Sequence, residues 1–254
     1  MNSRKMIYVH LHKCGGTSVE VVLSNHCKWN DVLIGSTFLG ELMQWQYFGQ
    51  FGLHKHSSAK EIKAVVGEEI WSEYFTWATV RNPYLRLASL WGYIASLITQ
   101  HAQEVGFPLG KPVAEWEEWA LRVDYPQSEP WSYPGVKAYL AVCNASQPFS
   151  AFVRHPDLKK EAAFQPQWWG LQDEAGERLA VNKVARLEEI GTEWPGLCAR
   201  LSFPDLPFAH ERKTEAQFKI APSDLLKDPE DAGFVRERFG EDFERFGYDP
   251  DAIP

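Results

Sequence analysis

Long hydrophobic runs are missing from this chain of 254 residues. It contains no stretch of about 18 consecutive apolar residues, so the sequence predicts no membrane-spanning helix. Residues 1–6 carry charge but lead into no apolar segment of the kind found in a secretory signal. Hydrophobic residues make up 44% of the chain, which is enough for a full core. We therefore expect a soluble, cytoplasmic protein built on one large domain.

Metal and redox motifs are absent as well. The chain has no HExxH, paired-cysteine or EF-hand pattern, so no metal site is predicted. Its four cysteines show no C-x-x-C spacing and are expected to be reduced thiols. A net charge of −8 argues against a broad nucleic-acid surface, because such a surface needs clustered basic residues. A polyanionic ligand would need a local basic cleft.

The most informative segment lies near the N-terminus. An apolar run at residues 6–11 predicts a buried strand, and apolar residues at helical spacing resume at Val19. Between them lies residues 12–18, His-Lys-Cys-Gly-Gly-Thr-Ser, which we call the donor loop. Its two glycines let the main chain approach a ligand closely, and the N–H groups of a new helix point at an anion. Lys13 adds a full positive charge, and two hydroxyls follow the glycines.

Two better-known phosphate loops do not fit this segment. The loop of nucleotide triphosphatases places lysine after its glycines, whereas Lys13 precedes them. A cysteine-phosphatase loop would need an arginine six residues after Cys14, where this chain has Glu20. Taken alone, the segment is equally compatible with an ordinary strand-to-helix turn.

A second strand-to-helix boundary strengthens the case for an anion site. Residues 75–80 form another apolar, β-rich run that stops at Arg-Asn-Pro, residues 81–83, and the proline suits the first turn of a helix. In that helix Arg86 and Ser89 are spaced to share one face. Arg81 at the strand end and Ser89 two turns into the helix could hold a second phosphate. A surface ion pair is the alternative for Arg81, but two strand-end anion sites rarely coincide by chance.

Both segments resemble motifs of carbohydrate-type sulfotransferases. Residues 12–18 look like that family's loop for the 5′-phosphosulfate of the donor. Residues 80–89, Val-Arg-Asn-Pro-Tyr-Leu-Arg-Leu-Ala-Ser, look like its 3′-phosphate motif. Residues 242–248, Asp-Phe-Glu-Arg-Phe-Gly-Tyr, resemble its closing segment. Animal members of this family are Golgi membrane proteins with a membrane anchor. The sequence predicts no such anchor, so we expect a soluble bacterial member.

The resemblance implies 3′-phosphoadenosine-5′-phosphosulfate as donor, 3′-phosphoadenosine 5′-phosphate as product, and no metal. The donor-binding residues carried over by position are Lys13, Cys14, Gly15, Gly16, Thr17, Ser18, Arg81 and Ser89. Lys13 would also be catalytic, because a lysine at the bridging oxygen stabilises charge that appears as the S–O bond breaks. Arg212 and Lys213 could close over the donor phosphates, with a solvated charge run as the alternative.

The acceptor needs a base, because a neutral hydroxyl is a weak nucleophile. Residues 54–56, His-Lys-His, resemble the His-x-His of heparan-sulfate uronosyl 2-O-sulfotransferases, which use histidine as the base. We take His56 first and His54 second, and one histidine could orient the other across an extended segment. Alternatively, one of them packs the turn before a helix that Ser58 and Glu61 open with a capping box.

The acceptor itself is less defined. We expect the hydroxyl of a glycan, glycolipid or small metabolite, and only secondarily an amine. Trp168 and Trp169, beside two glutamines, could form a sugar-stacking wall, although core packing is the commoner role of tryptophan. His10 is expected to face the core, and His12 is a further candidate for the acceptor pocket.

Predicted strands at residues 6–11, 75–80 and 181–187 alternate with helices. Further helices are expected at residues 58–66, 113–123, 194–201 and 230–246. The fold class is α/β, a P-loop-like three-layer α/β/α arrangement with a central parallel sheet that binds ligands at its C-terminal edge. We expect one sulfotransferase domain over residues 1–254, with a nucleotide-binding core at about 6–100 and 180–248 and an acceptor-side insertion at about 101–179.

Two other classes of protein stay open. A magnesium-dependent small-molecule or nucleotide kinase shares the fold but needs lysine after the glycines. A non-catalytic nucleotide-binding protein needs neither Lys13 nor His56, and both are present.

Overall fold

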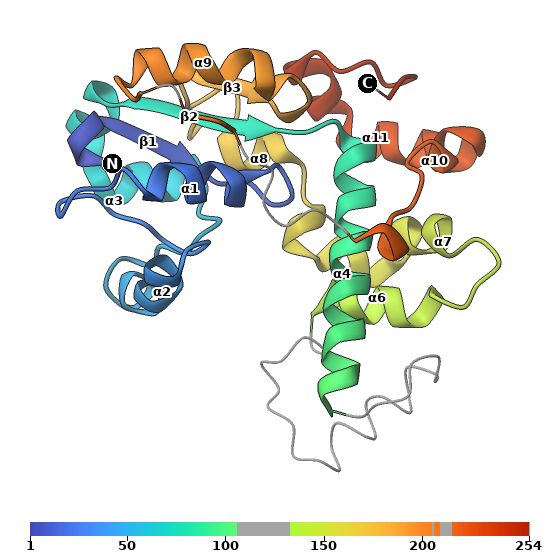
Figure 1. Ribbon diagram of the computed structural model, residues 1–254. Helices are drawn as coiled ribbons and strands as arrows, with labels where there is room; N and C mark the ends of the chain where they lie inside the picture. Colours follow the sequence, from blue (N-terminus) through green and yellow to red (C-terminus); the bar gives the residue numbers. More distant parts are fainter. Residues whose placement is uncertain (106–132, 205, 209–214, 254) are drawn as a thin grey trace.

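The computed structural model describes residues 1–105, 133–204, 206–208 and 215–253. Within them, β1 (Met6–Val9), β2 (Phe75–Val80) and β3 (Lys183–Arg186) form a parallel sheet in the order β1-β2-β3. All three strands were predicted from the sequence, although β1 and β3 are shorter than their apolar runs. The mixed α/β class is confirmed (Figure 1).

Helices connect the strands. Those between β1 and β2 are α1 (Gly16–Ser24), α2 (Phe38–Phe51) and α3 (Ala59–Glu73). Those between β2 and β3 are α4 (Pro83–Val105), α6 (Pro134–Val142), α7 (Pro148–Arg154) and α8 (Gln167–Leu171). After β3 come α9 (Ile190–Arg200), α10 (Asp224–Lys227) and α11 (Pro229–Phe246). Short 3-10 turns lie at Asn2–Arg4, Pro156–Lys160, Ala162–Phe164, Leu187–Glu189 and Ala216–Phe218.

Most helix predictions are confirmed, with shifted ends. The capping box of Ser58 and Glu61 opens α3, which continues beyond residue 66 across a kink at Gly67, whose φ is 85°. Helix α9 begins at Ile190, earlier than the predicted start at residue 194, and it contains Pro195. Helix α11 matches its prediction. The helix expected at 113–123 lies outside the described residues.

Alternating side chains of the sheet feed two apolar clusters, one on each face. Met6, Trp77 and Ala185 pack with side chains of α1 and α9. Val9 and Val80 pack on the other face with side chains of α3, α4, α8 and α11. The helices therefore cover both faces of the sheet, as a three-layer arrangement requires. The second cluster also contains Phe149, Phe152 and Phe164 from the predicted acceptor-side insertion.

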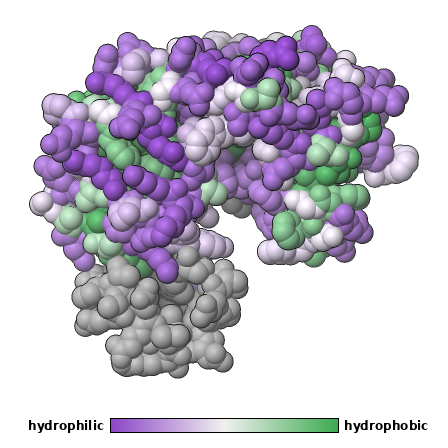
Figure 2. Space-filling model, turned by 180° about the vertical axis from the view of Figure 1, so that it is seen from behind, coloured by the Kyte–Doolittle hydropathy of each residue, from purple (hydrophilic) through white to green (hydrophobic). Residues whose placement is uncertain are grey.

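Helix α2 is the exception to this packing. It stands apart from the sheet layers in Figure 1, and Gly40 is its one buried residue. Figure 2, seen from behind, shows apolar atoms gathered on this lobe at the lower right. Thr37 caps its first turn by accepting a hydrogen bond from the Gly40 N–H at 3.0 Å. Within the described parts of the chain, no helix is long and apolar enough to cross a membrane.

Candidate active site

One large cleft, of about 1320 Å³, opens where the strands end. Residues that follow β1, β2 and β3 all contribute to its walls, because parallel strands bring their carboxyl ends to one edge. The predicted site residues that line it are Lys13, Gly15, Gly16, Thr17, Ser18, His56, Arg81 and Ser89. The structure thus brings together side chains that are far apart in the sequence.

The donor loop makes a tight turn into α1. Lys13 and Gly15 both have positive φ, at 63° and 78°, and Gly15 is the N-cap of the helix. A Cβ at Gly15 would lie 2.5 Å from Leu187 Cδ1, so glycine is needed for space as well as for φ. The turn places the first N–H groups of α1 at the cleft, which is the geometry of an anion site.

Cys14 differs from its neighbours in the loop. Its side chain is fully buried, and the thiol donates to Gln167 Oε1 at 3.0 Å. Burial raises the pKa of this thiol to about 12, so it stays protonated. The predicted donor contact of Cys14 can therefore come from its main chain alone, since the side chain is part of the core.

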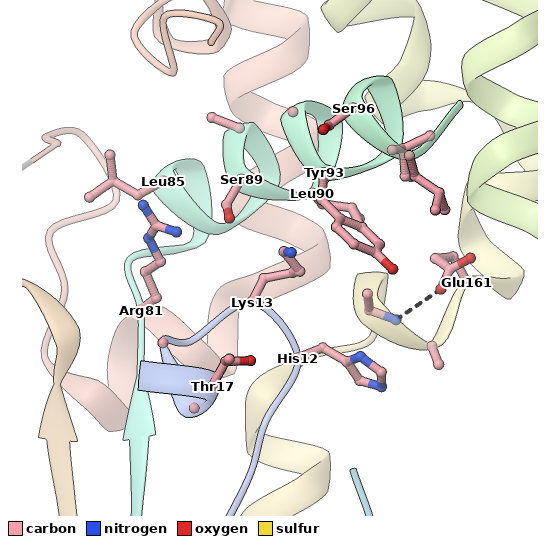
Figure 3. A pocket seen from close by; sticks show the side chains of 18 of the residues that line it. His12, Lys13, Thr17, Arg81, Leu85, Ser89, Leu90, Tyr93, Ser96 and Glu161 are labelled. Atoms are coloured by element: carbon pink, nitrogen blue, oxygen red, sulfur yellow. Dashed lines mark hydrogen bonds between the residues drawn. The ribbon is translucent and has the colours of Figure 1, made fainter. Parts of the chain in front are cut away.

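The Lys13 side chain extends from the donor loop toward α4 (Figure 3). Its ammonium sits over the ring of Tyr93, 3.9 Å from the ring centroid, and Tyr93 comes from α4. In Figure 3 the side chains of Lys13, Thr17, Arg81 and Ser89 are directed into one space. Two basic groups and two hydroxyls therefore surround the same part of the cleft (Figure 3).

Arg81 follows β2, and its main chain is held by a side chain from α8. Gln167 Oε1 accepts from the Arg81 N–H at 2.8 Å, and Gln167 Nε2 donates to the Arg81 carbonyl at 2.9 Å. The Arg81 guanidinium has no hydrogen-bond or ion-pair partner in the described residues, and burial lowers its pKa. An arginine that is desolvated and unpaired on a cleft wall favours binding of an anion.

The sequence placed Arg86 and Ser89 on one face of α4, but of these two side chains only Ser89 lines the cleft. The Arg86 side chain is buried, with 4% of its surface exposed. Nε donates to the His12 carbonyl at 3.0 Å, and a terminal nitrogen donates to the Gln165 carbonyl at 2.8 Å. Arg86 thus ties α4 to the donor loop, while Ser89 and Tyr93 of the same helix line the cleft.

The two histidines of residues 54–56 have different environments. His56 lines the cleft, whereas His54 is exposed and its Nδ1 accepts from the His56 N–H at 3.1 Å. His56 Nδ1 lies 3.0 Å from the His10 carbonyl. Because a carbonyl can only accept, this contact places the proton on Nδ1 and leaves the lone pair on Nε2.

A neutral imidazole is the form that can take a proton. Burial is the main cause that lowers the pKa of His56 well below its usual range. The rings of His12 and His56 stack with centroids 3.5 Å apart. Burial and then the Arg86 guanidinium lower the pKa of His12 to about 3. Both histidines are therefore neutral at pH 7.

The sequence missed the residues that hold the site in place. Asp242 of α11 is fully buried and accepts from the main-chain N–H groups of Gln167 and Trp168 at 2.9 and 2.8 Å. Glu188, after β3, accepts from the Asn82 N–H at 2.9 Å and from the Tyr248 hydroxyl at 2.9 Å. The resemblance of residues 242–248 to the family's closing segment was the one available signal, and it carried no role for these side chains.

The proposed tryptophan wall is not part of this cleft. Trp168 is 1% exposed and belongs to the core, and Trp169 lies beside Arg238 with its ring 5.2 Å from the guanidinium carbon. Gln167 is likewise buried, and its side chain accepts a hydrogen bond from the Arg81 main chain. Arg212 and Lys213 lie outside the described residues. Within the described ranges, no group of three or more histidine, cysteine or acidic side chains is placed to hold a metal ion.

Comparison with known proteins identifies the class. A model of the sulfotransferase family matches residues 2–249, and the chain therefore belongs to this family. It is a transferase whose family moves sulfuryl groups. No curated protein and no solved structure matches the chain.

Proposed function

We propose that the protein transfers the sulfuryl group of 3′-phosphoadenosine-5′-phosphosulfate to a hydroxyl of a glycan, glycolipid or small-molecule acceptor. The observation that carries this proposal is that Lys13 with its glycine loop, Arg81 with Ser89, and the neutral His56 all line one cleft at neighbouring strand ends. The donor loop would hold the 5′ end, and Arg81 and Ser89 the 3′-phosphate. Residues 6–100 and 180–248 would form this nucleotide-binding core, with residues 101–179 on the acceptor side.

The residues suggest how the transfer would proceed. His56 Nε2 accepts the proton of the acceptor hydroxyl as its oxygen attacks sulfur in line with the bond that breaks. The electrons of that S–O bond pass to the bridging oxygen of the departing nucleotide. Lys13 can leave the Tyr93 ring to reach this oxygen. Because negative charge develops on the oxygen as the bond breaks, the Lys13 ammonium stabilises the transition state more than the ground state.

Ligand titration tests this function against its alternatives. We expect 3′-phosphoadenosine 5′-phosphate to bind without magnesium and far more tightly than ATP, measured by calorimetry. Tight, magnesium-dependent binding of ATP would instead support a kinase. A protein that binds the bisphosphate but transfers no radiolabelled sulfate to any hydroxyl acceptor in a broad panel would support a non-catalytic nucleotide-binding protein.

A further inference from the structure

A buried ion pair lies beneath the donor loop. His10 Nδ1 is 3.0 Å from Glu20 Oε1, and the two side chains are 5% and 12% exposed. In the described part of the chain, neither Glu20 Oε2 nor His10 Nδ1 has a hydrogen-bond partner, so the contact between the two side chains is one of ion-pair distance alone. A buried carboxylate needs a positive counter-charge, and His10 is the basic side chain in ion-pair contact with it in the described residues. The pair therefore sets a basic side chain against a buried carboxylate beneath the donor loop.

The orientation of the His10 ring follows from its contacts with α1. Gly16 and Glu20 are one turn apart on the same face of that helix. A Cβ at Gly16 would lie 2.3 Å from His10 Nε2, so the ring rests directly on this glycine. With Nδ1 on Glu20 and Nε2 at Gly16, the ring runs along the first turn and directs Nε2 toward the helix N-terminus. His10 is also part of the cleft wall.

We propose that His10 is a donor-binding residue: Nε2–H binds an oxygen of the donor's 5′-phosphosulfate, and Glu20 is the counter-ion that supports the charge. This rests on the proposed function, in which the donor loop holds that end of the nucleotide. A charge-assisted hydrogen bond from His10 would act together with the N–H groups of α1 on the same anion.

Two nucleotides separate this role from a structural one. 3′-Phosphoadenosine 5′-phosphate carries a 5′-phosphate, whereas adenosine 3′-phosphate does not. His10→Gln should weaken binding of the bisphosphate by about tenfold or more, the usual effect of losing a charged hydrogen-bond partner, and should leave adenosine 3′-phosphate almost unchanged. Arg81→Ala is the matched control, because it should weaken both ligands.

Glu20→Gln keeps the shape of the side chain and tests the counter-ion. It should weaken binding of the bisphosphate selectively, and the double variant should bind no more weakly than His10→Gln, because the two residues act as one unit. Equal losses for both nucleotides, or unchanged bisphosphate binding in folded variants, would overturn the inference while the wild type still binds. Failure of the wild type to bind the bisphosphate would instead remove the proposed function.

Helix α2 carries an independent inference. Phe38, Leu42, Trp45 and Gly49 follow one another at spacings of four, three and four, so they form a single stripe. The three large side chains are 89%, 63% and 74% exposed. A Cβ at Gly49 would meet nothing within 4 Å, so another main chain can approach there closely.

The exposed apolar surface of α2 is large enough for a stable interface. The large side chains on or beside this stripe are Phe38, Leu39, Leu42, Trp45 and Phe48, with exposed fractions of 89, 59, 63, 74 and 52%, whereas Phe51 lies on the opposite side of the helix. This equals more than three fully exposed side chains, or roughly 670 Å² at about 200 Å² each. A monomer's largest patch is typically about 300–600 Å², and each partner of a stable complex buries about 800 Å².

The charges of α2 point to a second copy of this chain. Helices that lie on membranes carry lysine and arginine on their polar face, and α2 has neither. Its one charged residue, Glu41, already accepts from the Ser36 N–H at 2.9 Å and lies 3.5 Å from Lys55 Nζ. A neutral helix meets no repulsion from its own copy. We infer that the protein dimerises by packing α2 against α2 of a second copy.

Sedimentation equilibrium tests the dimer. We expect the wild type to dimerise and Leu42→Glu to be monomeric, because the substitution places a charge in the centre of the stripe. Gln50→Glu adds the same charge on the same helix away from the stripe and should remain dimeric. A wild type that stays monomeric over a wide concentration range, or a dimer that survives both Leu42→Glu and Trp45→Glu, would overturn the inference.

Discussion

The side-chain amide of Gln167 pairs with both main-chain groups of Arg81, at 2.8 and 2.9 Å. The same glutamine accepts from the Cys14 thiol at 3.0 Å, and its own main-chain N–H is held by Asp242. We call these four residues the Gln167 clasp. One buried amide thus fixes the donor loop and Arg81 relative to each other, and both relative to α11.

Arg81→Ala should weaken binding of 3′-phosphoadenosine 5′-phosphate by about 1.5–3 kcal/mol, as for a charged hydrogen-bond partner. The guanidinium is already largely shielded from solvent in the free protein, so binding a phosphate costs it little further desolvation. Calorimetry with the bisphosphate and with 5′-AMP measures the 3′-phosphate contribution directly. Arg178→Ala, at an exposed arginine paired with Asp173, should bind as the wild type does. Equal affinity of the wild type for both nucleotides would contradict the assignment.

Lys13→Ala should lower turnover by about 10²–10³-fold, in line with the loss of one preorganised electrostatic partner. The effect should appear mainly in kcat, because the charge it stabilises develops as the S–O bond breaks. A radiolabelled sulfate-transfer assay measures it. Lys5→Ala is the control, since Lys5 is exposed and pairs with Glu73. Near-native turnover of Lys13→Ala would remove its catalytic role.

His56→Ala should reduce turnover by about 10²–10⁴-fold while leaving donor-nucleotide affinity nearly intact. The base is active when unprotonated, and burial lowers the pKa of His56 in the free protein. kcat/KM should therefore be flat through neutral pH and fall only at acidic pH, below the ordinary histidine range near 6.5. His56→Ala should lose this acidic limb. His54→Ala should do less, and a profile unchanged in His56→Ala would move the role elsewhere.

Asp242→Ala should lower the free energy of unfolding by about 2–5 kcal/mol, because it leaves the N–H groups of Gln167 and Trp168 buried without an acceptor. Urea denaturation measures the loss. Glu241→Ala changes the adjacent exposed carboxylate and should stay within about 0.5 kcal/mol of the wild type. A stable Asp242→Ala variant would mean that water satisfies these groups.

Local patterns in the sequence were sufficient for the sheet and for several of the residues that line the cleft, although His10, expected in the core, is part of its wall. Strand and helix boundaries fall where apolar runs meet glycine or proline, and these boundaries are where a parallel sheet binds ligands. The burial of Arg86 and Cys14 could not be read locally, because it depends on Gln165 and Gln167, some 80 residues or more away in the chain. Helical spacing predicts on which face of a helix a residue lies, but not which residue of another element it contacts. The neutral state of His56 likewise depends on its packing against His10 and His12.

The Gln167 clasp also constrains when this protein can become active during its synthesis. The donor loop and Arg81 leave the ribosome well before Gln167, and Asp242 follows later still. A nascent chain could pair its first two strands and still lack the amide and the carboxylate that fix the site between them. Nucleotide affinity should therefore arise in one late step as α11 docks, and incomplete chains should not sequester the donor.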